Sequence, residues 1–265
     1  MNLYPNRIVV KVGTSTLTNE SGKTNLRIFD LLTRTLADIQ NLGFEVILVS
    51  SGAIAIGTNK MNLPQRPKTM RMKQAAAAVG QCSIMYLYDR FFSDYGKTTA
   101  QILLNAEDIE AEEKKENLCN TFNALLENGI IPVVNENDSV SYTEIESKER
   151  LFGDNDMLSA VTAILCRASR LVIFSDIDGF FDRDPRLFPD AHLIPCAQAT
   201  DESLAALAGG AGSRRGTGGM RTKLQAARLA CAQGIDTVIT NGSRPEALYE
   251  IAKGESVGTL FPGVR

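Results

Sequence analysis

The sequence predicts an α/β fold with a mainly parallel sheet that is covered by helices on both faces. Short runs of β-branched and other apolar residues alternate along the chain with longer stretches of helical periodicity. Such continuous apolar runs are typical of strands that are buried on both faces of a parallel sheet. Polar residues follow several of the runs, and ligands bind beyond the carboxyl ends of the strands in folds of this class.

Composition limits the possible classes of protein. The chain has 265 residues, of which 44% are hydrophobic and 22% charged, which suits one large domain or two lobes. The net charge of -3 argues against a general nucleic-acid binder. No apolar run approaches the ~20 residues of a membrane span, and the first residues lack a signal-peptide pattern, so we expect a cytoplasmic protein without a membrane partner.

The strands are expected where the apolar runs occur. In order, these segments are 8–12, 44–49, 98–104, 130–134, 171–174, 237–240 and 257–261. The run at 8–12 is interrupted by Lys11, and a lysine in a central strand is costly unless it is paired or lies at the strand end. Lys11 is therefore either a side chain that reaches solvent or a cation placed at the carboxyl end of the strand.

The helices are expected where apolar residues recur at helical spacing and where caps or glycines bound the pattern. In order, these segments are 25–43, 68–94, 111–127, 157–167, 201–207, 224–233 and 245–252. Asn25 is a capping residue at the start of the first, and Gly43, Gly129 and Gly234 mark ends of others. The charged segment 144–150 is expected to form a hairpin or flap.

A glycine-rich stretch, GGAGSRRGTGGMRTK at 209–223, precedes one of these helices. Glycines and a helix start bring backbone N–H groups close to an anion, and Lys223 adds a positive charge, so the stretch predicts a phosphate site. A surface loop with solvated basic residues is the alternative. The stretch matches neither the P-loop nor the G-x-G-x-x-G dinucleotide pattern.

Polar residues also gather where strands end. Lys11, Ser50–Gly52, Asn135–Asp138 and Ser175–Asp176 each close an apolar run, and Asp154, Asn155 and Asp156 precede a helix. One of these last three is expected to cap that helix, but three exceed what one cap needs. The five cysteines are spread and expected to be reduced, and His192 is the only histidine, in a loop-like stretch. Chemistry must therefore use lysine, acidic, amide and hydroxyl groups, which suits phosphoryl transfer.

Seven motifs in this order span nearly the whole chain. They are VVKVGTS at 9–15, VSSGAIAIG at 49–57, AVGQ at 78–81, PVVNEND at 132–138, FGDNDMLSA at 152–160, FSDIDGFFDRDPR at 174–186 and GTGGMRTKLQAA at 216–227. Jointly they resemble the amino acid kinase family, and more narrowly its members that act on glutamate. The resemblance implies a three-layer α/β/α sandwich with a mostly parallel sheet of about eight strands. It also implies ATP-dependent phosphorylation of the γ-carboxylate of L-glutamate, the first step of proline biosynthesis.

The resemblance also implies roles for individual residues. The N-terminal lobe, about 1–168, would bind glutamate, and the C-terminal lobe, about 169–265, would bind ATP. The expected catalytic residues are Lys11, Lys223, Asp154 and Asp156. The glutamate-binding residues are expected to be Ser51, Asp138 and Asn155. The nucleotide-binding residues are expected to be Lys11, Ser175, Asp176, Thr217, Gly218, Gly219, Met220, Arg221, Thr222 and Lys223.

The same resemblance leads to expectations about cofactors, partners and alternative functions. Mg²⁺ would accompany ATP, held mostly by phosphates and water, and its protein ligands are left unassigned. The resemblance implies a homo-oligomer, dimer or tetramer, with proline as a feedback inhibitor. Many relatives carry a further C-terminal PUA domain, which this chain is expected to lack. Alternatives are another acceptor, such as aspartate, acetylglutamate or carbamate, or a non-catalytic nucleotide or amino-acid sensor.

Overall fold

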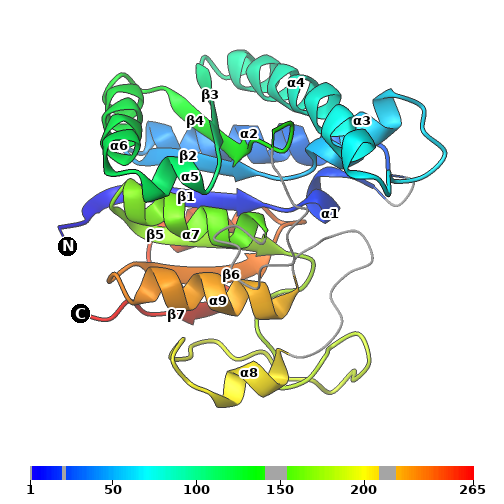
Figure 1. Ribbon diagram of the computed structural model, residues 1–265. Helices are drawn as coiled ribbons and strands as arrows, with labels where there is room; N and C mark the ends of the chain where they lie inside the picture. Colours follow the sequence, from blue (N-terminus) through cyan, green and yellow to red (C-terminus); the bar gives the residue numbers. More distant parts are fainter. Residues whose placement is uncertain (1, 20–21, 141–153, 209–218) are drawn as a thin grey trace.

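The computed structural model describes residues 2–19, 22–140, 154–208 and 219–265 (Figure 1). The predicted flap at 144–150 and most of the glycine-rich stretch lie outside these residues. In chain order, the helices and strands of the described residues are β1 (Tyr4–Val12), α1 (Thr14–Leu17), α2 (Leu26–Asn41), β2 (Glu45–Ser50), α3 (Ala53–Lys60), α4 (Met70–Asp94), β3 (Thr99–Leu104), α5 (Glu107–Glu110), α6 (Glu112–Glu127), β4 (Ile131–Glu136), α7 (Asn155–Leu165), β5 (Ala168–Ser175), α8 (Ser203–Leu207), α9 (Met220–Cys231), β6 (Asp236–Asn241), α10 (Ala247–Ala252) and β7 (Thr259–Phe261).

The described strands form one seven-stranded sheet in the order β3-β4-β2-β1-β5-β6-β7. Every neighbouring pair is parallel except β6 and β7, which are antiparallel. The expected α/β fold is therefore confirmed, with seven strands in the described part where about eight were expected. Each of the seven was visible as an apolar run, whereas the count of eight came only from the resemblance.

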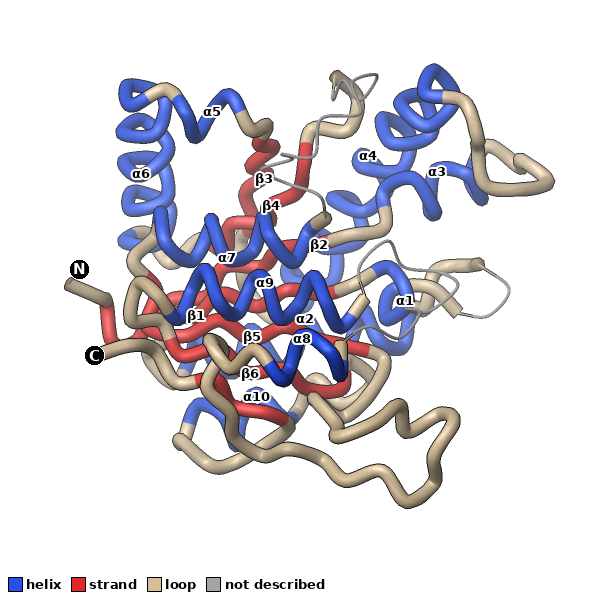
Figure 2. The backbone as a smooth tube through the Cα atoms, turned by 60° about the horizontal axis from the view of Figure 1, so that its bottom comes forward, coloured by secondary structure: helices blue, strands red, loops and turns tan. Residues whose placement is uncertain are grey.

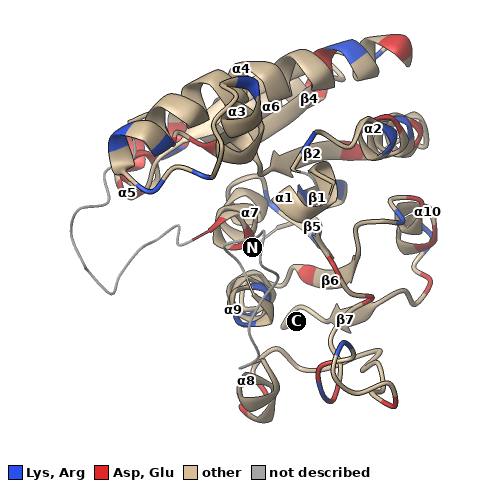
Figure 3. Ribbon diagram, turned by 90° about the vertical axis from the view of Figure 1, so that its right-hand side faces the viewer, with Lys and Arg blue, Asp and Glu red and all other residues tan. Residues whose placement is uncertain are grey.

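Helices cover both faces of the sheet (Figures 1 and 3). On one face, α6, α7 and α9 pack on alternate strand residues such as Val9, Val49 and Leu171. On the other face, α2, α4 and α10 pack on the intervening residues, such as Val10 and Leu48. Both cores are built from the period-two alternation of buried strands, and the result is the expected three-layer sandwich.

Two helices at the candidate site start earlier than the sequence predicts. Helix α7 begins two residues early, at Asn155, because the Asp154 side chain caps it by accepting from the backbone N–H groups of Asp156 and Met157. Helix α9 begins at Met220 rather than Leu224, which places Lys223 inside its first turn. The first residues of these two helices are mostly polar or basic and carry no apolar periodicity, so the pattern places both starts too late.

Helix α3 was not predicted, because a short segment with an internal glycine resembles a loop. Its backbone packs directly against α4: a Cβ on Gly57 would lie 1.8 Å from the Ala76 carbonyl oxygen, and one on Gly80 equally close to that of Ala53. Tertiary packing therefore overrides the low helix propensity of this segment. The contact holds the turn between β2 and α3, where Gly52 has a φ of +105°.

The topology defines where a site can form. Strand β1 lies between β2 and β5, and the chain builds one half of the sheet on each side of it. The carboxyl ends of β1, β2, β4 and β5 therefore meet around the point where the strand order reverses, the usual ligand position in this class of fold. Figure 2 shows both termini on the side of the molecule opposite to α1, away from the carboxyl ends of these strands. Among the described helices, none is long and apolar enough to cross a membrane.

Candidate active site

The centre of the site is the fully buried carboxylate of Asp156, in the first turn of α7. Its Oδ1 lies 2.6 Å from Nζ of Lys11, and its Oδ2 lies 3.0 Å from Nζ of Lys223. The hydroxyl of Thr222 donates to the same Oδ2 at 2.8 Å. One carboxylate thus joins three elements, and two lysines that are far apart in the sequence meet on it.

Strand and helix periodicity aim these three side chains at one another. Along β1, Val10 and Val12 face the core beneath α2, so Lys11 faces the side of the sheet that α7 and α9 cover, as Val9 does. Lys223 lies in the first turn of α9, which packs beside α7. Lys11 is thus paired at its strand end, as the functional interpretation of this residue requires.

Burial and charge oppose each other in this cluster. Burial acts to raise the pKa of Asp156, but the two ammonium groups outweigh it and hold that pKa well below its usual range. Burial lowers the pKa of Lys11, and Lys223 lowers it further, while Asp156 works against both. The charge of Lys11 therefore depends on the shared carboxylate. Within the described residues, each ammonium group contacts only Asp156, so N–H groups of both lysines remain for an anion.

Among the described residues, Asp154 makes no ion pair with either lysine, although its charge acts to raise the pKa of Lys11. Its Oδ1 caps α7, and its Oδ2 is buried with no hydrogen-bond partner among the described residues. Three consecutive polar residues thus do three different things: Asp154 caps the helix, Asp156 joins the lysines, and Asn155 points to a neighbouring cavity.

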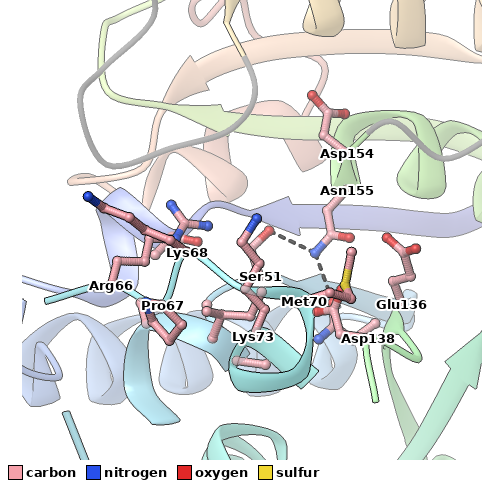
Figure 4. A pocket seen from close by; sticks show the side chains of 16 residues that line it. Ser51, Arg66, Pro67, Lys68, Met70, Lys73, Glu136, Asp138, Asp154 and Asn155 are labelled. Carbon is pink, nitrogen blue, oxygen red and sulfur yellow. Dashed lines mark hydrogen bonds between the residues drawn. The ribbon is translucent and has the colours of Figure 1, made fainter. Parts of the chain in front are cut away.

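That cavity has a volume of about 650 Å³ and lies beyond the carboxyl ends of β2 and β4 (Figure 4). The three predicted glutamate-binding residues, Ser51, Asp138 and Asn155, all line it. Asn155 Nδ2 donates to Ser51 Oγ at 2.9 Å, to Asn135 Oδ1 at 2.8 Å and to the Ser50 carbonyl at 3.1 Å. Asp154 also lines the cavity, so the cavity adjoins the lysine cluster at the start of α7.

Charge is distributed on two sides of this cavity. Glu136 and Asp138 come from the end of β4, and burial together with the nearby Glu136 raises the pKa of Asp138 to about 6, although Arg66 opposes this. The side chains of Arg66, Lys68 and Lys73 come from the segment around the start of α4 (Figure 4). An amino acid has both an ammonium group and carboxylates, which suits a cavity with both signs of charge.

The basic residues of the cavity were missed by the sequence analysis. Arg66, Lys68 and Lys73 do not follow a strand, and their spacing could equally belong to a solvated surface. Asn135 was noted as part of the polar run 135–138 at the end of β4, but no role was predicted for it. Their only signal was the cluster of positive charges around Pro67, which does not by itself distinguish a cavity wall from an exposed loop.

The predicted nucleotide residues fall into two groups. Ser175 and Asp176 lie at the end of β5, beside the end of β1, and Asp176 lies 3.5 Å from Arg186 in an exposed ion pair. Gly219 is the N-cap of α9, and Met220 to Lys223 form its first turn. Thr217 and Gly218 lie outside the described residues. Neither group lines the cavity, and the second group shares Thr222 and Lys223 with the cluster around Asp156.

Comparison with known sequences identifies relatives along almost the whole chain. The family model described as the amino acid kinase family matches residues 6–241. A glutamate 5-kinase from Clostridium perfringens is 52% identical over 96% of this chain and 94% of its own length. A glutamate 5-kinase from Caldanaerobacter subterraneus is 49% identical over 96% of this chain, which spans 67% of that protein.

Solved structures with the same fold are more distant in sequence. A carbamate kinase from Giardia lamblia, bound to AMP-PNP, has a TM-score of 0.69 at 15% identity and covers 98% of this chain and 99% of its own. A UMP kinase from Bacillus anthracis has a TM-score of 0.66 at 16% identity and covers 99% and 98%. These similarities confirm the fold and say nothing about the acceptor.

Replacement of Asp156 by Asn should destabilise the protein by on the order of 3 kcal/mol, because two buried ammonium groups lose their counter-charge. Urea unfolding at pH 7 measures this. The matched control is Asp154→Asn, which keeps a capping oxygen at the start of α7 and should change the unfolding free energy by less than about 0.5 kcal/mol. Equal stability of the two variants would contradict the proposed dependence on Asp156.

Proposed function

The chain belongs to the amino acid kinase family, and we propose that it works as a glutamate 5-kinase in which Asp156 holds two lysines at the point of phosphoryl transfer. It transfers the γ-phosphoryl group of ATP to the γ-carboxylate of L-glutamate and forms L-glutamyl 5-phosphate, the first step of proline biosynthesis. The observation that carries the assignment of roles is the Lys11–Asp156–Lys223 cluster beside a cavity that has both acidic and basic side chains.

The chemistry needs charge neutralisation more than a base. The acceptor is already a carboxylate, so no proton has to be removed before it attacks the γ-phosphorus. The difficulty is the approach of two anions, and preorganised positive charge relieves it. Lys11 and Lys223 would donate their remaining N–H groups to oxygens of the transferred phosphoryl group. Asp156 fixes both positions without taking part in bond making.

The acceptor would bind in the cavity beyond the carboxyl ends of β2 and β4, next to the start of α7. Asp138 suits the ammonium group of glutamate, and Ser51 and Asn155 suit its polar contacts. We assign the wall formed by Arg66, Lys68 and Lys73 to the carboxylates, because it supplies the opposite charge. On the ATP side, Ser175, Asp176 and the start of α9 would hold the nucleotide. This assignment keeps the proposed division into lobes at about residue 168.

The buried Oδ2 of Asp154 fits a Mg²⁺ ion that is held mainly by ATP. The described residues contain no group of three or more His, Cys, Asp or Glu side chains that could hold a metal ion. Asp154 Oδ2 is the buried oxygen without a hydrogen-bond partner beside the cluster, and it could accept from a metal-bound water or bind the ion itself. When bound, the ion would neutralise phosphate charge alongside the two lysines.

Inhibition by proline at or beside the glutamate cavity, assembly into a dimer or tetramer and a cytoplasmic location are further parts of the proposal. They rest on the family resemblance. A different acceptor, such as aspartate, acetylglutamate or carbamate, is the strongest competing function, because the family resemblance allows it. The presence of an acidic side and a basic side in one cavity favours an amino acid over carbamate, which has no ammonium group.

The assignment predicts glutamate-dependent conversion of ATP to ADP, with the acyl phosphate trapped by hydroxylamine as a hydroxamate. Aspartate, acetylglutamate and carbamate should be tested in the same assay. Turnover with one of these but not with glutamate would sink the assignment. Binding of ATP without turnover for any acceptor would favour a sensor.

The raised pKa of Asp138 predicts a pH dependence of acceptor binding. The ionised carboxylate is the form that binds an ammonium group, so kcat/KM for glutamate should fall as the pH drops through about 6, by up to tenfold per pH unit below it. Steady-state kinetics between pH 5 and 8 measure this. In Asp138→Asn the value should be lower throughout and lack this inflection. A wild-type profile that is flat down to pH 5 would contradict the role of Asp138.

A further inference from the structure

A chain of three amide side chains ends at the acceptor cavity. Gln81, on α4, accepts a hydrogen bond from Asn135 Nδ2 through its Oε1 at 2.9 Å. Asn135 Oδ1 in turn accepts from Asn155 Nδ2 at 2.8 Å. Asn155 then reaches Ser51 Oγ and the Ser50 carbonyl. Gln81 does not line the acceptor cavity, whereas Asn135, Asn155 and Ser51 do.

The direction of this chain follows from its ends. The Ser50 carbonyl can only accept, so Asn155 must present its NH₂ group there. The same NH₂ group faces Asn135, which must therefore present its oxygen to Asn155 and its NH₂ group to Gln81. Gln81 satisfies that NH₂ group with Oε1. Asn135 is 3% exposed, so loss of the Gln81 oxygen would leave a buried donor unpaired.

This direction decides what the cavity offers to a substrate. The two hydrogens of the Asn155 NH₂ group are shared among three acceptors, of which Ser51 Oγ is one, so the hydroxyl proton of Ser51 is left to donate to an anionic oxygen. Asn155 uses its NH₂ group within the chain, which leaves its Oδ1 as an acceptor, and within the described residues that oxygen makes no hydrogen bond. The cavity thus offers a hydrogen-bond donor, which suits a carboxylate, and an acceptor, which suits an ammonium group.

We propose that Gln81 is a positioning residue of the acceptor site, which sets the orientation of Asn155 and Ser51 through Asn135 without touching the substrate. The side chain lines a second cavity of about 410 Å³ between α4, β3 and the end of β4, which shares Ala53, Glu136 and Asp138 with the acceptor cavity. Its Nε2 is buried and has no hydrogen-bond partner among the described residues. The bond from Asn135 is therefore the contact through which a change of Gln81 acts. The inference rests on the proposed function, since it concerns the binding of glutamate.

Gln81→Met tests it, because Met keeps the length of the side chain and removes the accepting oxygen. It should raise KM for glutamate about tenfold, while kcat and KM for ATP stay within about twofold. The matched control is Gln101→Met, the same change in an exposed side chain that lines the same second cavity. Gln101→Met should leave all three constants unchanged. Gln81→Glu, which keeps an accepting oxygen for Asn135, should restore KM to within about threefold of wild type.

A double variant separates this role from a general loosening of the site. In an Asn155→Ala background, which removes the last amide of the chain, Gln81→Met should have no further effect on KM. Multiplication of the two single effects would overturn the proposal, as would a Gln81→Met KM within twofold of wild type. The proposed function fails separately, through absence of glutamate turnover in the wild-type protein, and titration calorimetry of glutamate binding tests Gln81 even then.

Discussion

A single buried carboxylate, shared by two lysines from opposite ends of the chain, is the interaction on which the rest of the structure depends. Burial lowers the pKa of Lys11 and Asp156 opposes this, so the carboxylate favours the charged form of Lys11. The two lysines meet on Asp156 because β1 lies in the middle of the sheet. The strand order therefore makes this cluster of charges possible, because it brings β1 and α9 to the start of α7.

Neighbouring residues at the start of α7 serve two parts of the site, the lysine cluster and the acceptor cavity. Successive residues of a helix point about 100° apart, so Asn155 and Asp156 face different directions, and the N-cap Asp154 turns back onto the helix start. Asp156 faces the lysines, Asn155 faces the acceptor cavity and Asp154 caps the helix. A shift of this one helix would move the phosphoryl-transfer side and the acceptor side together. The capping bonds of Asp154 thus contribute to the geometry of both.

Much of this could be predicted from the sequence, but not all of it. The strands and long helices followed from apolar periodicity, and Lys11 stood out because it interrupts a buried run. The separate roles of Asp154 and Asp156 could not be predicted, because they depend on the phase of a helix whose start the pattern placed two residues late. The positions of Arg66 and Lys68 and the Gln81–Asn135 contact depend on how α3 and α4 pack against each other, through close backbone contacts at Gly57 and Gly80 that no local pattern shows.

The central claim is that the two lysines act on the transferred phosphoryl group while Asp156 holds them. The most direct measurement is kcat for glutamate-dependent ADP formation by Lys223→Ala, with circular dichroism to establish that the variant is folded. The account predicts a fall in kcat of about 10²–10³, with KM for glutamate within a few-fold of wild type, because Lys223 lies outside the acceptor cavity. A folded variant with kcat within about threefold of wild type would contradict it.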